Sequence, residues 1–167
     1  ANRLGIDKLE PIVTRGIFVD LAPLPGAPEH GPIHLAQLMT AVARGGVTPE
    51  PGDALLVRTG WLAAWREGRA SVEQSAGLHQ DCADWIVDQG FALVAADNIA
   101  VEVQPSGDPD NAVPLHIKLI RDHGIYLAEL LDLEPLAVAD QAAFLLTIAP
   151  LRIKGGVGSP ITPVAVL

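Results

Sequence analysis

The chain has 167 residues, of which 49% are hydrophobic and 4% aromatic, and its formal charge is −9 at pH 7. This acidic balance argues against nucleic acid and against membrane surfaces as partners, because both attract clustered cations. No apolar run reaches the roughly 18 residues that span a bilayer, and the single cysteine, Cys82, cannot form an internal disulfide. We therefore expect one cytoplasmic domain over residues 1–167, with a large aliphatic core and an apolar subunit interface typical of a homo-oligomer.

The predicted elements alternate in type along the chain. Strands are expected over 14–22, 54–60 and 91–97, helices over 33–46 and 79–89, a helix and a buried strand within 114–133, and strands over 142–153 and 161–167. The unbroken apolar runs ALLVRTG and FALVAAD are typical of strands that are covered on both faces. This alternation predicts an α/β domain, and the consecutive strand-like pieces at the C-terminus predict a mixed sheet.

Three motifs are best explained without chemistry. KGGVGSP (154–160) lacks the spacing of a phosphate-binding loop and indicates a tight glycine turn between two strands. His30 and His34 have the spacing of a helical metal pair, but Gly31 and Pro32 interrupt the helix, so we expect surface-loop histidines. Cys82 lies on an amphipathic helix and is expected to be a small core residue.

Two acids, a histidine and an amide occupy positions that suggest a site. Glu129 stands in the apolar stretch IYLAELL, and a buried carboxylate must pair, protonate or bind a cation. His116 begins the helix before that stretch. Asp97 and Asn98 follow a buried strand, where α/β proteins place ligand-binding groups, although a turn or capping role explains Asp97 equally well.

Five segments in order carry a resemblance to a known family: RTGWLAAW, GLHQDCADWI, VAADNIAVEV, PLHIKLIRDHGIYLAELLDL and APLRIKGGVGSPITPVAVL. Together they resemble the cyclase family of metal-dependent hydrolases, which includes kynurenine formamidases and isatin hydrolases. The resemblance implies a swivelling β/β/α domain with a mixed sheet and a divalent metal, manganese or zinc. It also implies hydrolysis of small-molecule amides, by ring opening of cyclic amides or deformylation of aryl formamides.

The same resemblance implies roles for individual residues. His116 matches a metal-ligating histidine of the family, and Glu129 matches a glutamate that serves as a ligand or as the catalytic carboxylate that moves protons. Asp97 and Asn98 would orient groups at a substrate site. Trp61 would wall an aromatic substrate, and a plain core position is an equally good interpretation of that tryptophan.

One part of the family pattern is missing from this sequence. The His-x-Gly-Thr-His-x-Asp segment that supplies three metal ligands does not occur, and the opening residues resemble the middle of a family member. The first hypothesis is therefore a metal-dependent amide hydrolase that is incomplete in this sequence, either because the sequence is truncated or because the N-terminal metal motif comes from a companion chain or segment. The alternative is a non-catalytic binding or assembly subunit that retains the cyclase-like fold.

Overall fold

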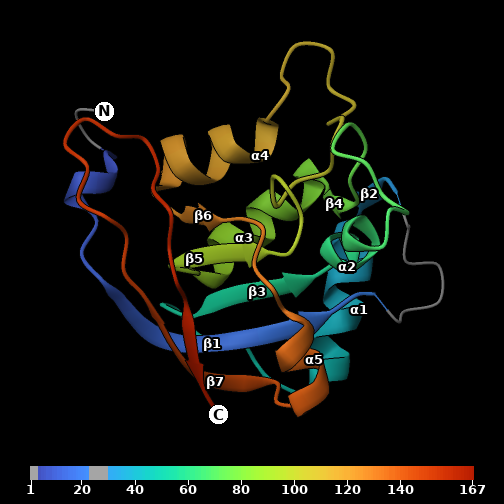
Figure 1. The fold of residues 1–167 in the computed structure, drawn as a ribbon, viewed down its shortest axis with the longest axis horizontal. Helices are drawn as coiled ribbons and strands as arrows, with labels where there is room; N and C mark the ends of the chain where they lie inside the picture. The colour runs from blue at the N-terminus through green and yellow to red at the C-terminus, as the bar shows by residue number, and fades with distance from the viewer. Residues whose placement is uncertain (1–3, 23–29) are drawn as a thin grey trace.

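A computed structural model of the chain describes residues 4–22 and 30–167. Its main feature is a six-stranded mixed sheet in the order β6-β5-β3-β1-β7-β8 (Figure 1). The strands are β1 (Ile12–Asp20), β3 (Ala54–Arg58), β5 (Leu93–Ala96), β6 (Tyr126–Ala128), β7 (Ala143–Ile148) and β8 (Val164–Val166). Strands β1, β3, β5 and β6 run parallel to one another, whereas β7 is antiparallel to β1 and β8 is antiparallel to β7. The predicted mixed α/β sheet is thereby confirmed.

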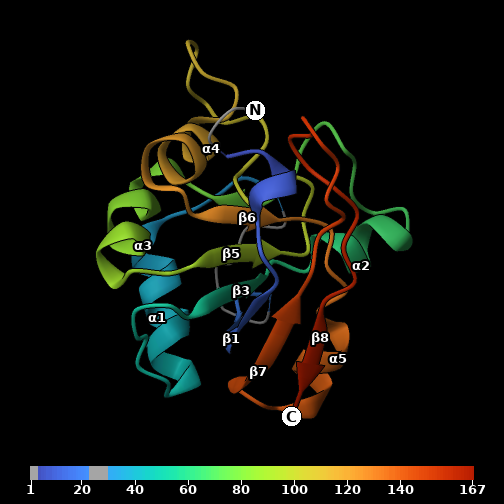
Figure 2. The same ribbon diagram turned by 90° about the vertical axis from the view of Figure 1, so that its left-hand side faces the viewer.

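The helices lie on both sides of this sheet. They are η1 (Ile6–Lys8), α1 (Leu35–Gly45), α2 (Trp61–Arg66), η2 (Gln80–Cys82), α3 (Ala83–Gln89), α4 (Pro114–His116), η3 (Ile117–Asp122) and α5 (Glu134–Ala139). Figure 2 shows α1, α3 and α4 against one face, and α5 and the C-terminal segment against the other. Helix α4 continues directly into η3, which is π-helical. No helix in the described part of the chain has both the length and the apolar character needed to cross a membrane.

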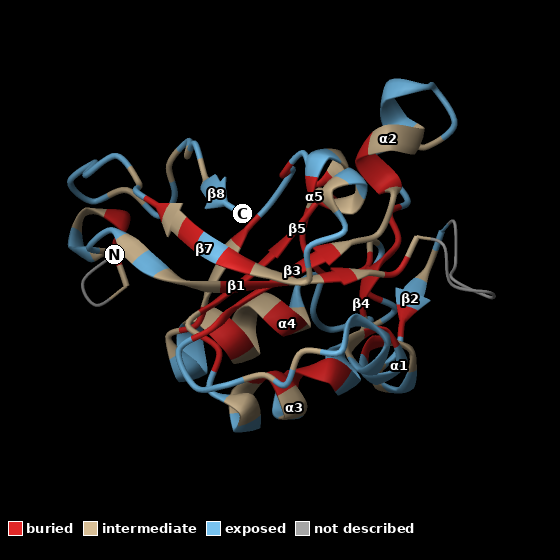
Figure 3. Cartoon of the chain, turned by 90° about the horizontal axis from the view of Figure 1, so that it is seen from below, coloured by how far each residue is buried: buried red, intermediate tan, exposed pale blue. Residues whose placement is uncertain are grey.

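The core has two halves, separated by the central strands. In β3, Leu55 and Val57 join the cluster under the helices, whereas Ala54 and Leu56 join the cluster on the opposite face. Successive side chains of a strand point to opposite faces, so a strand buried on both sides must be apolar throughout. This explains the uninterrupted apolar run that the sequence shows there, and Figure 3 shows the buried strands between exposed outer elements. Cys82 is fully buried in the helix-side cluster, as expected.

A short parallel ladder lies beside the main sheet and positions a loop. It pairs β2 (Pro32–Ile33) with β4 (Gly77–Leu78), and Leu78 also bridges to Glu102. Strand β4 passes so close to the backbone of Glu102 that a β-carbon at Gly77 would lie 2.4 Å from the carbonyl carbon of Glu102. Real β-carbons do not approach other atoms so closely, so glycine is required at this position for steric reasons.

Several boundaries differ from those expected. The strand predicted over 142–153 ends at Ile148. The glycine segment 154–160 contains the expected tight turn, closed by a hydrogen bond from the N–H of Gly156 to the carbonyl of Ile153, but this turn lies within a long irregular stretch and does not join two strands directly. Proline at 150 cannot donate to the sheet, which favours the early end of the strand. The largest correction concerns Glu129, which follows β6 instead of lying within it, and its side chain is 37% exposed.

Candidate functional site

The centre of the candidate site is a pair formed by Glu102 and His116. The carboxylate of Glu102 is 2% exposed and accepts hydrogen bonds from the backbone N–H groups of Leu115 (3.0 Å) and His116 (3.1 Å) at the start of α4. One of its oxygens lies 2.5 Å from Nδ1 of His116. A carboxylate at a helix start is favoured by the unpaired N–H groups there. Glu102 therefore fixes both the helix start and the orientation of the imidazole.

Glu129 stands on the other side of the same imidazole. Its Oε1 lies 3.2 Å from Nε2 of His116, so the histidine is held between two carboxylates from different segments. The structure thus brings together His116 and Glu129, as the sequence predicted. The third member, Glu102, was missed as a partner, because it lies fourteen positions before His116 in the sequence, across a loop, and no local spacing relates them.

The two carboxylates control the protonation of His116. Burial by itself would lower the pKa of the imidazole, but hydrogen bonds with Glu102 and Glu129 outweigh it and raise that pKa from 6.5 to about 9. In the metal-free chain His116 is therefore cationic at neutral pH. A bound cation at Nε2 would take the place of this proton.

This shift predicts that stability depends on pH in the metal-free chain. Because the folded-state pKa of His116 lies above the unfolded value, its contribution is complete below about pH 6.5 and is lost as the pH rises through about 9. We expect the free energy of unfolding to fall by on the order of 2 kcal/mol over this range, since the partly exposed Glu129 is screened by solvent. Urea unfolding at pH 6.5 and 9.5, in the presence of a chelator, measures this difference in the free energy of unfolding. His116→Gln should flatten the dependence, whereas His123→Gln should preserve it.

The side chains of His116 and Glu129 line a cavity of about 530 Å³. Its walls combine β6 and its neighbours with the C-terminal stretch, and the lining residues include Ile12, Leu93, Tyr126, Ile148 and Ile161. Most of this lining is apolar, with His116 and Glu129 as charged groups. A cavity of this size that has few polar groups among apolar walls is typical of small-molecule sites.

The backbone next to both carboxylates is strained. Val101 (φ 58°) precedes Glu102 and Leu130 (φ 57°) follows Glu129, so each acid adjoins a residue in the left-handed region. This region costs a non-glycine residue on the order of 1 kcal/mol or more, most for β-branched side chains. Strain of this kind persists where surrounding contacts hold the backbone in place, and it often occurs at functional sites.

The other predicted site residues do not line this cavity. Asp97 is buried and accepts hydrogen bonds from the N–H and Oγ1 of Thr59 and from the N–H of Gly60. Burial raises the pKa of Asp97 in spite of these hydrogen bonds. Its contacts join the ends of β3 and β5, in agreement with the turn role that the sequence left open.

Asn98 and Trp61 also have partners elsewhere. Nδ2 of Asn98 donates to the carbonyl oxygens of Ala76 (2.7 Å) and Glu102 (3.3 Å), so this amide supports the loop that carries Glu102. Trp61 is buried in α2, where its indole N–H donates to the carbonyl of Ser71 and its ring stacks on Trp65. The structure therefore connects Asn98 to the site through the backbone of Glu102 and places Trp61 apart from it.

Comparison with known proteins places this architecture in a family. A family model described as "Putative cyclase" matches residues 2–103. The crystal structure of a novel cyclase is 38% identical and superposes with a TM-score of 0.84 over 98% of this chain. The chain belongs to this cyclase family. The family model ends before His116 and Glu129, so the match by itself assigns them no role.

More distant cyclase-like structures share the fold. An isatin hydrolase bound to the product analogue thioisatinate is 22% identical, with a TM-score of 0.75 over 93% of this chain. A potential metal-dependent hydrolase with cyclase activity is 17% identical, with a TM-score of 0.69 over 99% of this chain. No curated protein matches the sequence. This cyclase-family chain spans 56% of the novel cyclase, 60% of the isatin hydrolase and 69% of the potential hydrolase.

Proposed function

We propose that this chain is part of a metal-dependent amide hydrolase whose site is built around His116 and Glu129. The observation that carries the proposal is the Glu102–His116–Glu129 arrangement at the wall of an apolar cavity. A metal-ligating histidine usually donates its second ring N–H to a carboxylate, and Glu102 at Nδ1 fills that position. The donor set therefore fits a divalent metal held by Nε2 of His116 and the carboxylate of Glu129.

Each residue then has a distinct task. Glu102 keeps the His116 proton on Nδ1, so that Nε2 presents its lone pair to the cavity. A divalent metal bound there would supply an activated water and polarise the amide carbonyl. Glu129 has two carboxylate oxygens: Oε1, which lies beside Nε2 of His116, would bind the metal, and Oε2 would accept a proton from water and return it to the leaving nitrogen.

The cavity supports the proposed substrate class. Its apolar walls fit an aromatic ring, and the two charged residues lie where an amide attached to that ring would be hydrolysed. The isatin hydrolase relative was solved with thioisatinate, an analogue of its own product. We therefore propose cyclic aryl amides and aryl formamides as substrates.

His116 and Glu129 supply two metal ligands, whereas a typical catalytic or structural zinc site has three or four protein ligands. We propose that the remaining ligands come from a second copy of the chain or from a companion segment. Turnover by the 167-residue chain without those ligands should accordingly be weak.

Metal binding tests the proposal independently of turnover. The chelator-treated chain should bind Mn²⁺, and its affinity should rise about tenfold per pH unit between pH 6 and 8, because the proton on His116 must leave. Calorimetry on His116→Gln and Glu129→Gln should show at least a tenfold loss of affinity. Mn²⁺ binding that is independent of pH and of both substitutions would contradict the site.

Controls and an activity assay complete the test. His123→Gln and Glu73→Gln change an exposed histidine and an exposed glutamate, and both should leave Mn²⁺ affinity unchanged. Ring opening of isatin and deformylation of an aryl formamide can be followed by absorbance with Mn²⁺ or Zn²⁺ present. Metal binding without hydrolysis, even with a companion segment supplied, would favour the non-catalytic binding subunit.

A further inference from the structure

A second group of potential metal ligands lies at the ends of the short parallel ladder. The register pairs Ile33 of β2 with Leu78 of β4, so the next residues, His34 and His79, emerge side by side. Their ring centroids are 4.4 Å apart, and the N–H of His79 donates to the carbonyl of Ile33 (2.9 Å). Backbone pairing thus holds two imidazoles together, although 45 residues of sequence separate them.

Asp81 completes the group from the first turn of η2. One carboxylate oxygen lies 2.8 Å from Nδ1 of His34, and the other lies 3.2 Å from Nδ1 of His79. The N–H of Leu35 also donates to Asp81 (3.1 Å), which fixes the carboxylate against the start of α1. One ligand atom from each of the three residues lies within 4.8 Å of the others.

Hydrogen bonding within the group leaves an electrostatic conflict. Nδ1 of His79 accepts from the backbone N–H of Asp81 (3.3 Å), and an imidazole nitrogen that accepts carries a lone pair there. The same nitrogen is 3.2 Å from a carboxylate oxygen, which also carries only lone pairs when ionised. A cation between these atoms removes the repulsion, and the formal charge of −9 for the whole chain favours cation binding.

We propose that His34, His79 and Asp81 bind a divalent transition-metal ion of the zinc type. Two imidazoles and one carboxylate are a common zinc ligand set. Zinc bonds of 2.0–2.1 Å in a tetrahedron place neighbouring ligand atoms about 3.3 Å apart. The 3.2 Å between Nδ1 of His79 and Asp81 matches this spacing, whereas the 2.8 Å between Nδ1 of His34 and Asp81 is a hydrogen bond that has to lengthen when an ion binds. The bound ion joins the start of α1 to the start of η2, two segments that the short ladder and the hydrogen bond from Leu35 to Asp81 already hold together.

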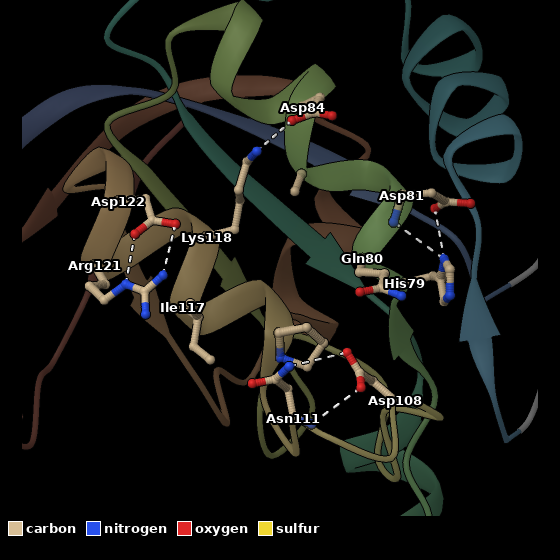
Figure 4. Close-up of a pocket in the computed structure, with 12 residues that line it drawn as sticks. His79, Gln80, Asp81, Asp84, Asp108, Asn111, Ile117, Lys118, Arg121 and Asp122 are labelled. Atoms are coloured by element: carbon tan, nitrogen blue, oxygen red, sulfur yellow. Dashed lines mark hydrogen bonds and ion pairs between the residues drawn. The ribbon is translucent and has the colours of Figure 1, made fainter.

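The location makes this site distinct and accessible. None of the three residues lines the cavity of His116 and Glu129. His79 and Asp81 instead line one end of a groove of about 580 Å³, where Figure 4 shows them beside Gln80. The three side chains are between 26% and 51% exposed, so an ion can reach them from solvent.

Zinc titration of the chelator-treated 167-residue chain tests the site with a crossed set of variants. The double variant His116→Gln/Glu129→Gln removes the candidate active site and should still bind one zinc ion. Asp81→Asn and His79→Gln, each introduced into that double variant, should weaken this binding by at least tenfold. Asp81→Asn retains an oxygen that can accept from Leu35, and His123→Gln in the same background serves as the matched control.

A measurement on the unsubstituted chain removes any dependence on variant folding. Long-range ¹H–¹⁵N spectra should show zinc-induced shifts of Nδ1 in His34 and His79. Loss of all zinc binding in the His116→Gln/Glu129→Gln variant, or unchanged zinc affinity after Asp81→Asn, would overturn the inference. Zinc shifts confined to His116 would also overturn it while leaving the proposed function intact.

Discussion

Replacing Glu102 by glutamine is expected to lower the free energy of unfolding by about 3 kcal/mol and to bring the pKa of His116 well below 9. The carboxylate accepts three hydrogen bonds, from the N–H groups of Leu115 and His116 and from the His116 ring. Glutamine keeps one acceptor oxygen and turns an NH₂ group toward a donor. A buried donor left without an acceptor accounts for most of the expected loss.

Chemical denaturation measures the stability change, and NMR titration of the His116 ring measures the pKa. The matched control is Glu73→Gln, which makes the same change at an exposed position and should alter stability by less than about 0.5 kcal/mol. Metal affinity at the candidate site should fall by about 10- to 100-fold with Glu102→Gln, because an orienting partner is removed. A His116 pKa that stays near 9 in this variant would show that Glu102 does not control the imidazole.

The second large change in the free energy of unfolding is expected when Asp97 is replaced. Replacement by alanine removes the acceptor of three hydrogen bonds from Thr59 and Gly60, which join the end of β3 to the end of β5. We expect Asp97→Ala to lower the free energy of unfolding by about 3 kcal/mol, since the two backbone N–H groups lose their partner inside the protein. Asp97→Asn should cost less, because an amide oxygen can still accept and no charge remains buried.

Asp84→Ala is the control for this comparison. That side chain is 82% exposed and forms an ion pair with Lys118, so its removal should change stability by less than about 1 kcal/mol. The Asp97 variants should also leave the His116 pKa unchanged, because Asp97 has no contact with the imidazole among its hydrogen bonds. An Asp97→Ala variant as stable as the parent chain would contradict the structural role.

The elements that sequence patterns located well are those with one strong local signal. The strand predicted over 54–60 is β3 (Ala54–Arg58), and the helix predicted over 33–46 is α1 (Leu35–Gly45), which ends at the left-handed Gly46. The strand is marked by its unbroken apolar run, and the helix by its apolar spacing and the glycine at its end; both signals lie in nearby residues. The short ladder of β2 and β4 has two residues in each strand, and such a brief pairing leaves no periodic pattern to detect.

The candidate site also combines features that the sequence pattern located with features that it did not. The type and order of His116 and Glu129 directed attention to two residues that the structure places 3.2 Å apart. The reason offered for Glu129 was wrong, because the acid follows the apolar strand instead of lying within it, and the buried acid is Glu102. Hydropathy alone cannot separate a residue at the end of a three-residue strand from one inside it.

Composition, apolar runs and glycine positions thus determined the α/β class, the mixed sheet and the negative net charge. Only the tertiary structure decided which acid faces which imidazole, both at His116 and at the His34, His79 and Asp81 group. Secondary structure depends largely on residues that are close together in the sequence, so short stretches of sequence contain the signals that predict it. The contacts at both sites join segments 13 to 47 residues apart, and strand pairing and loop packing alone bring those segments together.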